Sequence, residues 1–114
     1  MKFNITDKLQ LEQPVLEIGD HSFTVDNSKD KMLAFWEMID NTPQDKRMID
    51  FFEDGIRHFL GDAAMETITA MRLTVKGYEK VMIAVLSLAG EETFEETEAR
   101  FHRNITETAE PAVV

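Results

Sequence analysis

The sequence predicts a mostly α-helical fold with a small N-terminal β-hairpin, an α+β arrangement of about four to five helices around a central apolar helix. Two short runs near the N-terminus alternate apolar and polar residues, as half-buried strands do. The remainder repeats apolar residues at helical spacing, and its longest apolar run, residues 81–89, suits a buried helix because it is too short to cross a bilayer. We expect a single helical domain over residues 1–105 and a disordered acidic tail over residues 106–114.

The hairpin is expected from strands at Val15–Ile18 and Ser22–Val25. Gly19 lies between them, and a glycine allows the positive φ of a tight turn at little steric cost. Two upstream segments, Phe3–Ile5 and Leu9–Leu11, are candidates for an additional edge strand. Because an isolated hairpin is only marginally stable in water, this one should pack against the helices or be completed by a neighbouring molecule.

Two helices should follow the hairpin. The first should begin after Ser28, where residues 26–28 offer side-chain oxygens for capping, and should end near Ile39. The second should begin at Thr42-Pro43, because a capping hydroxyl there precedes a proline at the first helical position. Gly61 should end this second helix as its C-terminal cap.

The second helix carries a broad apolar stripe. Its apolar residues recur at steps of three and four, which predicts a face wide enough for a core: Met48, Ile49, Phe51, Phe52, Ile56, Phe59 and Leu60. Phe51 and Phe52 are adjacent and cannot face the same way. Either the buried face is wide or one of the two rings serves a partner.

Three more helices complete the expected fold. A short helix should cover Asp62–Thr69 and end in a bend near residues 70–74, because β-branched residues weaken its continuation. The central helix should span about Val75–Leu88, and since it is apolar on nearly every side, other elements should surround it. Gly90 should end this helix, and a last helix should run from Glu91 to Arg103.

Composition and charge exclude several functional classes. The 114 residues include 22 Asp and Glu against 12 Lys and Arg, a formal net charge of -10. Such a charge repels nucleic acids and anionic membranes, so we expect neither as a partner. Cysteine is absent, which excludes disulfides, thiolate zinc sites and cysteine nucleophiles and favours a reducing compartment such as the cytoplasm. The charged N-terminus also lacks the apolar core of a signal peptide.

The acidity is concentrated near the C-terminus. Residues 43–90 hold seven acids and six bases, whereas residues 91–114 hold seven Glu against Arg100 and Arg103. We interpret this excess as charge that keeps the protein dispersed, placed beside an apolar interaction surface.

Signs of catalysis are weak. His58 lies four residues from both Asp54 and Asp62, a spacing that can bring three metal ligands to one helical face. Gly61 should break the helix before Asp62, and no second His or Cys is near, so a solvated polar face is the better interpretation. The scattered glycines form no phosphate loop, and adjacent acids on a helix diverge by about 100°. We therefore expect no enzyme, no metal site and no cofactor, with a metal-dependent enzyme using Asp54 and His58 as a minor alternative.

The distinctive residues are apolar: seven Met, eight Phe and one Trp. Phe94 and Phe101 form a narrow stripe on the last helix, extended by Ile105, which buries little unless a second helix from its own or another chain covers it. We name these three residues, together with Trp36 and Met32, as candidate partner-binding residues. The alternative is that such side chains fill the core, where Met adapts readily to gaps.

The order of elements matches one known family. Four features of this sequence carry the resemblance: the hairpin Val15–Val25, the helix start at Thr42-Pro43, the stretch Asp54–Ile68, and the acidic end after Gly90. In the family a similar helix ends in a Gly, a small acidic turn, Ala, Glu and Ile before another helical segment. The sequence therefore resembles the small tail assembly chaperones, or tape measure chaperones, of long-tailed bacteriophages and prophages of Gram-positive bacteria.

This resemblance implies a non-catalytic protein that binds the long, helical and apolar tape measure protein and keeps it soluble before the tail tube polymerises. It also implies the tail tube protein as a second candidate partner, self-association into a homo-oligomer, and action in the host cytoplasm without entering the mature virion. An alternative from another class is an acidic inhibitor that mimics nucleic acid and blocks a DNA-binding enzyme. The apolar content of 43% and the concentration of charge at one end favour the chaperone.

Overall fold

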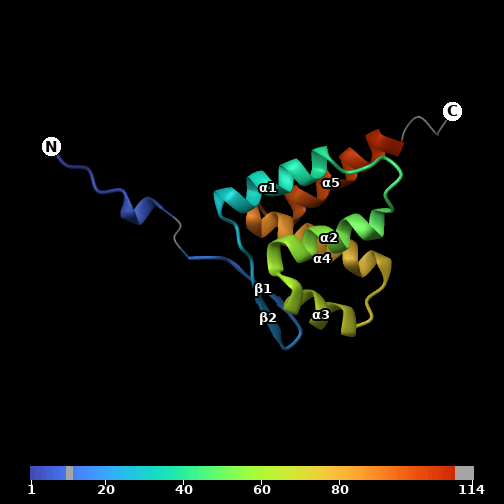
Figure 1. Cartoon of the computed structure of the whole chain (residues 1–114). Coiled ribbons are helices and arrows are strands. Elements are labelled where there is room, and N and C mark those ends of the chain that lie inside the picture. Colours follow the sequence, from blue (N-terminus) through green and yellow to red (C-terminus); the bar gives the residue numbers. More distant parts are fainter. Residues whose placement is uncertain (10–11, 110–114) are drawn as a thin grey trace.

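The structure, a computed structural model, describes residues 1–9 and 12–109, with the backbone alone for residues 104–109 (Figure 1). The described residues form a short 3-10 helix, a two-stranded antiparallel sheet and five α-helices. The predicted fold class, mostly α with a small N-terminal hairpin, is therefore confirmed. Within this part of the chain, no helix combines the length and apolar character that a membrane crossing requires.

Residues 1–9 form an N-terminal arm that projects away from the helices (Figure 1). It contains the 3-10 helix η1 (Thr6–Lys8), and the Asn4 side chain accepts hydrogen bonds from the backbone and the hydroxyl of Thr6. The predicted edge strand at Phe3–Ile5 is wrong, because the sheet of the described residues contains only the two hairpin strands. Of the second candidate segment, Leu9 belongs to no strand, and residues 10–11 lie outside the described residues.

The hairpin consists of β1 (Val15–Ile18) and β2 (His21–Thr24), joined at Gly19, whose φ is 58°. The second strand begins and ends one residue earlier than predicted. One face of the hairpin packs inward through Phe23, which is buried, and through Leu16 and Ile18, which contact the core. The hairpin is thus supported by the helices, and β1 lies against the central helix.

The first helix, α1 (Lys29–Asp40), begins as predicted, with the Ser28 side chain accepting from the Lys31 amide. The predicted start of the next helix at Thr42-Pro43 is wrong, because α2 spans Met48–Leu60. The Thr42 hydroxyl donates to the Met38 carbonyl at 2.6 Å and so belongs to the end of α1. Pro43 then opens a turn in which the Lys46 amide donates to the Pro43 carbonyl.

Helix α3 (Asp62–Ala70) and helix α4 (Val75–Ala89) are separated by the predicted bend, where Arg72 has a φ of 56°. The Thr74 hydroxyl caps α4 by accepting from the Gly77 amide at 3.0 Å. Helix α4 is the central helix, as predicted, and its buried residues are Tyr78, Val81, Met82, Ile83, Val85, Ser87 and Ala89. It contacts α2, α5 and β1.

The core lies mainly between α2 and α4. Gly55 allows these helices to approach closely, since a Cβ at this position would lie 2.5 Å from the Met82 Cε. Phe52 is buried and its ring centroid lies 5.7 Å from that of Phe101, while Phe51 stacks on Phe35 at 6.3 Å. Both adjacent phenylalanines therefore contact their own chain, and the wide-face interpretation of α2 is the one the structure supports.

The last helix, α5, spans Phe94–Ala109 and lies beside α4. It begins later than the predicted Glu91 because residues 91–93 form the connection from α4, with Glu91 at a φ of 56°. It also continues past Arg103, through residues 106–109, which were predicted to belong to a disordered tail. Residues 110–114 of that tail lie outside the described residues.

Candidate functional site

The five predicted partner-binding residues do not form one surface. Phe101 packs on the core through Phe52, and Met32 is also packed against the core. Phe94 is half-buried, with the Lys80 Nζ 5.9 Å from its ring centroid. Ile105 belongs to α5, but its side chain lies outside the described residues.

Trp36 is different, because 54% of its surface is exposed. It lies on α1 between Leu33 and Ile39, which are 44% and 43% exposed. Steps of three residues turn an α-helix by about 300°, so the three side chains fan over an arc of about 120°. We call Leu33, Trp36 and Ile39 the α1 surface.

The opposite side of α1 holds the helix on the body of the protein. Phe35 is buried, and its ring lies 5.0 Å from Phe59 and 6.0 Å from His58, centroid to centroid. The His58 Nε2 lies 2.9 Å from the Lys31 carbonyl oxygen, within hydrogen-bond distance. These contacts orient α1 so that Leu33, Trp36 and Ile39 face outward, while Met32 and Met38 pack against the core.

Two acidic side chains lie at the C-terminal end of the α1 surface, and Lys29 is exposed at its N-terminal end. Glu37 and Asp40 are exposed and lie on the same helix. Neither forms an ion pair with another of the described residues. An apolar strip beside unpaired carboxylates suits a segment that is apolar along one face and carries basic side chains at its edge.

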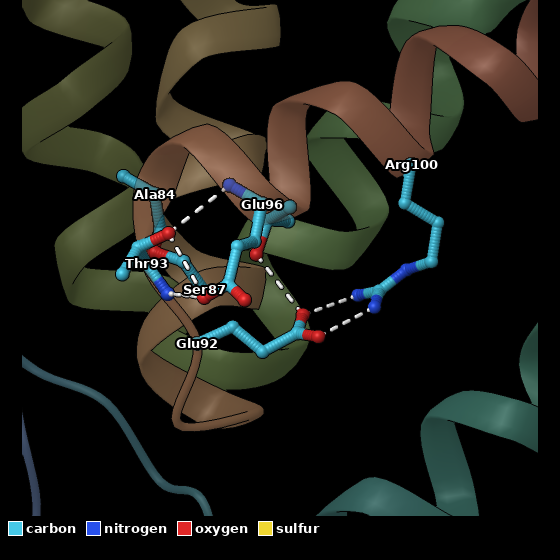
Figure 2. A network of polar contacts seen from close by, with 7 residues as sticks. Ala84, Ser87, Glu92, Thr93, Glu96 and Arg100 are labelled. Atoms are coloured by element: carbon cyan, nitrogen blue, oxygen red, sulfur yellow. Dashed lines mark hydrogen bonds and ion pairs between the residues drawn. The ribbon is translucent and has the colours of Figure 1, made fainter.

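A polar network lies at the N-terminal end of α5 (Figure 2). Both carboxylate oxygens of Glu92 accept from Arg100, at 2.6 and 2.5 Å, and Oε1 also accepts from the buried Thr97 hydroxyl at 3.1 Å. The hydrogen bond from Arg100 lowers the pKa of Glu92, and the bond to Glu92 raises the pKa of Arg100. The loop before α5 is thereby tied to the second turn of the helix.

The start of α5 is a capping box. The Glu96 amide donates to the Thr93 hydroxyl oxygen at 3.1 Å, while the Thr93 amide donates to the Glu96 carboxylate at 3.0 Å. Threonine followed three residues later by glutamate is the sequence signature of this motif. The signature at Thr93 and Glu96 indicates a helix start at Phe94, three residues after the predicted start at Glu91.

Two further side-chain contacts join α5 to α4. Lys80 pairs with Glu98, which lowers the pKa of Glu98 through the hydrogen bond between them, and His102 lies 3.1 Å from Glu79. Glu98 of α5 and Glu92 of the preceding loop are therefore both paired within the chain. This arrangement differs from the row of evenly spaced, unpaired charges that a nucleic-acid mimic would present.

The three residues of the alternative metal site, Asp54, His58 and Asp62, each contact another group of the protein instead of one another. Asp54 pairs with Lys46 at 2.5 Å, and Asp62 lies 3.4 Å from Arg57. His58 is occupied with the Lys31 carbonyl. Among the residues whose side chains the structure describes, no group of three metal-ligating side chains occurs.

An open hollow between α2 and α3 is lined by Arg57, Asp62, Met65, Glu66 and Thr69. Its basic side chain, Arg57, is already paired with Asp62 and with Asp54. The hollow therefore has no unpaired basic side chain that could bind an anionic ligand.

No family model, curated protein or solved structure matches this chain. Inference about function consequently depends on the geometry and charge of the protein itself. Among the side chains described, the α1 surface combines exposed apolar area, a rigid helical support and unpaired flanking charge. We therefore take it as the candidate interaction site.

Proposed function

We propose that this protein is a tail assembly chaperone of a long-tailed phage or prophage, which binds the helical, apolar tape measure protein and keeps it soluble before the tail tube polymerises. The observation that carries the proposal is the α1 surface, three exposed large apolar side chains on a helix whose other face is anchored in the core. The net charge of -10 supports it, because like charge disperses the complexes that form.

The binding mode follows from the shape of the surface. An amphipathic helix of the tape measure protein lies along α1 and covers Trp36, while basic residues at its edge approach Glu37 and Asp40. No bond is made or broken in this process, so the function requires neither a catalytic residue nor a cofactor. The tail tube protein is a second candidate partner.

The expected affinity of one such contact is low. Covering the α1 surface removes on the order of 250 Å² of apolar area from water, which contributes roughly 6 kcal/mol before association costs of about 4–15 kcal/mol. A single contact therefore forms only transiently. Many copies along one long client, associated with each other as homo-oligomers, gain avidity and coat it effectively.

The low affinity also fits the role. A coat that assembles through many weak contacts is displaced readily when the tail tube protein polymerises around the client. The chaperone is then absent from the mature virion and remains in the host cytoplasm.

The test is co-expression with the tape measure protein encoded in the same phage or prophage genome. The wild-type chain should keep that protein in the soluble fraction, whereas the triple variant Leu33→Ser, Trp36→Ser, Ile39→Ser should not. Val75→Ser is the matched control, because Val75 is an exposed apolar residue at the start of α4, and it should behave like the wild type. Circular dichroism of the purified variants checks that they are folded.

A tape measure protein that stays insoluble with the wild-type chain would refute the proposal. The nucleic-acid mimic predicts something else, namely binding to a basic nuclease or repressor that is abolished by salt. The apolar contact with the tape measure protein should survive about 1 M NaCl, where the Debye length is only about 3 Å. Salt dependence therefore separates the two functions.

A further inference from the structure

The N-terminal arm exposes a second set of large apolar side chains. Phe3 is 75% exposed, and Met1, Ile5 and Leu9 are also open to solvent. The arm makes the molecule extended, with a radius of gyration of 16.0 Å against about 13 Å for a compact chain of this length. Apolar side chains held away from the body in this way gain nothing from the protein's own core.

The arm differs in charge from the body. Residues 1–9 carry Lys2 and Lys8 against Asp7, a net charge of +1. The rest of the chain carries a net charge of -11, and the two add to the total of -10. Within the described part of the chain, neither lysine forms an ion pair. The carboxylates of Glu37 and Asp40, beside the α1 surface, also form no ion pair with a described residue.

The arm and the α1 surface are therefore complementary in both apolar character and charge. We propose that the arm of one copy of this chain docks on the α1 surface of a second copy, and that the second copy returns the same contact. Phe3 and Ile5 cover Trp36, and Lys2, next to Phe3, approaches Glu37 and Asp40, while Lys8 lies toward the other end of α1, where Asp30 is exposed. A reciprocal exchange closes the pair and leaves neither set of apolar side chains exposed.

The dimensions permit this exchange. With the 3-10 turn at Thr6–Lys8, residues 1–9 reach about 25 Å, and a helix of twelve residues is about 18 Å long, so the arm spans the whole of α1. Two such contacts bury on the order of 1,000 Å², which places the dimer at the weak end of specific interfaces. A weak dimer forms and dissociates within an experimentally accessible range of concentration.

The exchange has a consequence that rests on the proposed function. The α1 surface that receives the client is covered by the partner's arm when no client is present. The client helix replaces that arm on one copy, while the second arm contact keeps the two copies associated. The free chaperone then has no exposed apolar surface at α1, which keeps copies from binding unrelated proteins.

Trp36 is the one tryptophan of the chain, so its fluorescence reports directly on the proposed contact. In the purified full chain without client, the Trp36 emission should shift to the blue as the concentration rises, in step with dimer formation measured by sedimentation equilibrium. In the variant Phe3→Ser, Ile5→Ser, both the shift and the dimer should be lost. Val75→Ser should keep both, and Lys2→Glu with Lys8→Glu should weaken both at low salt.

Three results would overturn the exchange: a monomeric wild type at all concentrations, a dimer that survives in the arm variant, or a Trp36 emission that is independent of concentration. The arm lies outside the core, so its variants keep the fold, and Trp36→Ser provides the reciprocal test by sedimentation. Because no client is present, these results are separate from those of the chaperone assay. A strictly monomeric chain that still kept the tape measure protein soluble would refute the exchange and leave the proposed function standing.

Discussion

Replacing Gly55 with alanine tests the close packing of α2 against α4. In an exposed helix this change stabilises by about 1 kcal/mol, because alanine has the higher helix propensity. At Gly55 the added Cβ would lie 2.5 Å from the Met82 Cε and 2.7 Å from its Sδ. Met82 is only 1% exposed, so the end of its side chain has no solvent to move into.

The two effects differ in magnitude. Overpacking a well-filled core costs about 1–3 kcal/mol, which outweighs the gain in propensity and leaves a net loss of about 1 kcal/mol. For a chain of this length that loss lowers the melting temperature by roughly 3–6 °C. Urea unfolding followed by circular dichroism at the helical band measures the difference in free energy of unfolding.

Two companion variants separate the effect of helix propensity from the effect of overpacking. Ala99→Gly, at an exposed position of α5, measures the propensity term alone and should destabilise by about 1 kcal/mol. Met82→Val removes the two clashing atoms, so Gly55→Ala should become stabilising, or at least neutral, in that background. An increase in stability for Gly55→Ala alone would show that α2 and α4 are not packed as closely as described.

Three other predictions concern the junction of α4 and α5. Glu91→Gly should stabilise by about 0.5 kcal/mol in urea unfolding, because glycine adopts the positive φ of this position without the Cβ penalty; an unchanged or lower stability would contradict it. Thr93→Ala should destabilise by about 1 kcal/mol through loss of the capping box, whereas Thr93→Ser should stay close to the wild type. Because Arg100 lowers the pKa of Glu92 in the folded chain, this pair stabilises fully above the ordinary value of 4.5 and less as the pH falls through the lowered folded pKa. Thermal melts from pH 6 to about pH 3 should show a smaller loss for Glu92→Gln than for the wild type, and equal losses would argue against the ion pair.

The order and type of the elements could be predicted because most of them follow from local patterns. The alternation of residues 15–25 and the glycine between the strands gave the hairpin, and the apolar run of residues 81–89 gave the central helix. Ser28 and Gly61 marked helix ends by their own chemistry. These signals lie within a few residues of the feature they specify.

The errors arose where one residue could serve two neighbouring elements. Thr42 before a proline has the chemistry of a helix start, but its hydroxyl bonds backward to Met38 at the end of α1. Gly90 was expected to end α4, and it does so, but the left-handed residue is Glu91, which shifts the start of α5 to Phe94. Local chemistry alone does not say which of the two elements such a residue joins.

The candidate site was predictable only in part, because α1 has apolar residues on most of its circumference. Leu33, Phe35, Trp36 and Ile39 give no clear division between an inner and an outer face in the sequence. The division comes from α2, whose Phe59 and other aromatic side chains hold Phe35 and leave the other three outside. Such a choice depends on tertiary contacts between distant residues.

The apolar stripe on α5 also depends on tertiary contacts, but here other helices cover residues that were predicted to bind a partner. Phe101 was predicted as a partner-binding residue because α5 has few apolar side chains of its own. In the structure, Phe52 of α2 covers it, and the Lys80–Glu98 ion pair joins the helix to α4. Whether a narrow stripe faces its own chain or another one is decided by the space that the remaining helices leave.

Site-specific photocrosslinking tests the central claim, that the α1 surface receives the tape measure protein. A photoreactive phenylalanine analogue replaces Leu33 in one variant and Val75 in a second, and each is irradiated in the presence of the tape measure protein. We expect a crosslink from position 33, and none or much less from position 75. A crosslink from position 75 alone, or none from position 33 while the complex is intact, would contradict it.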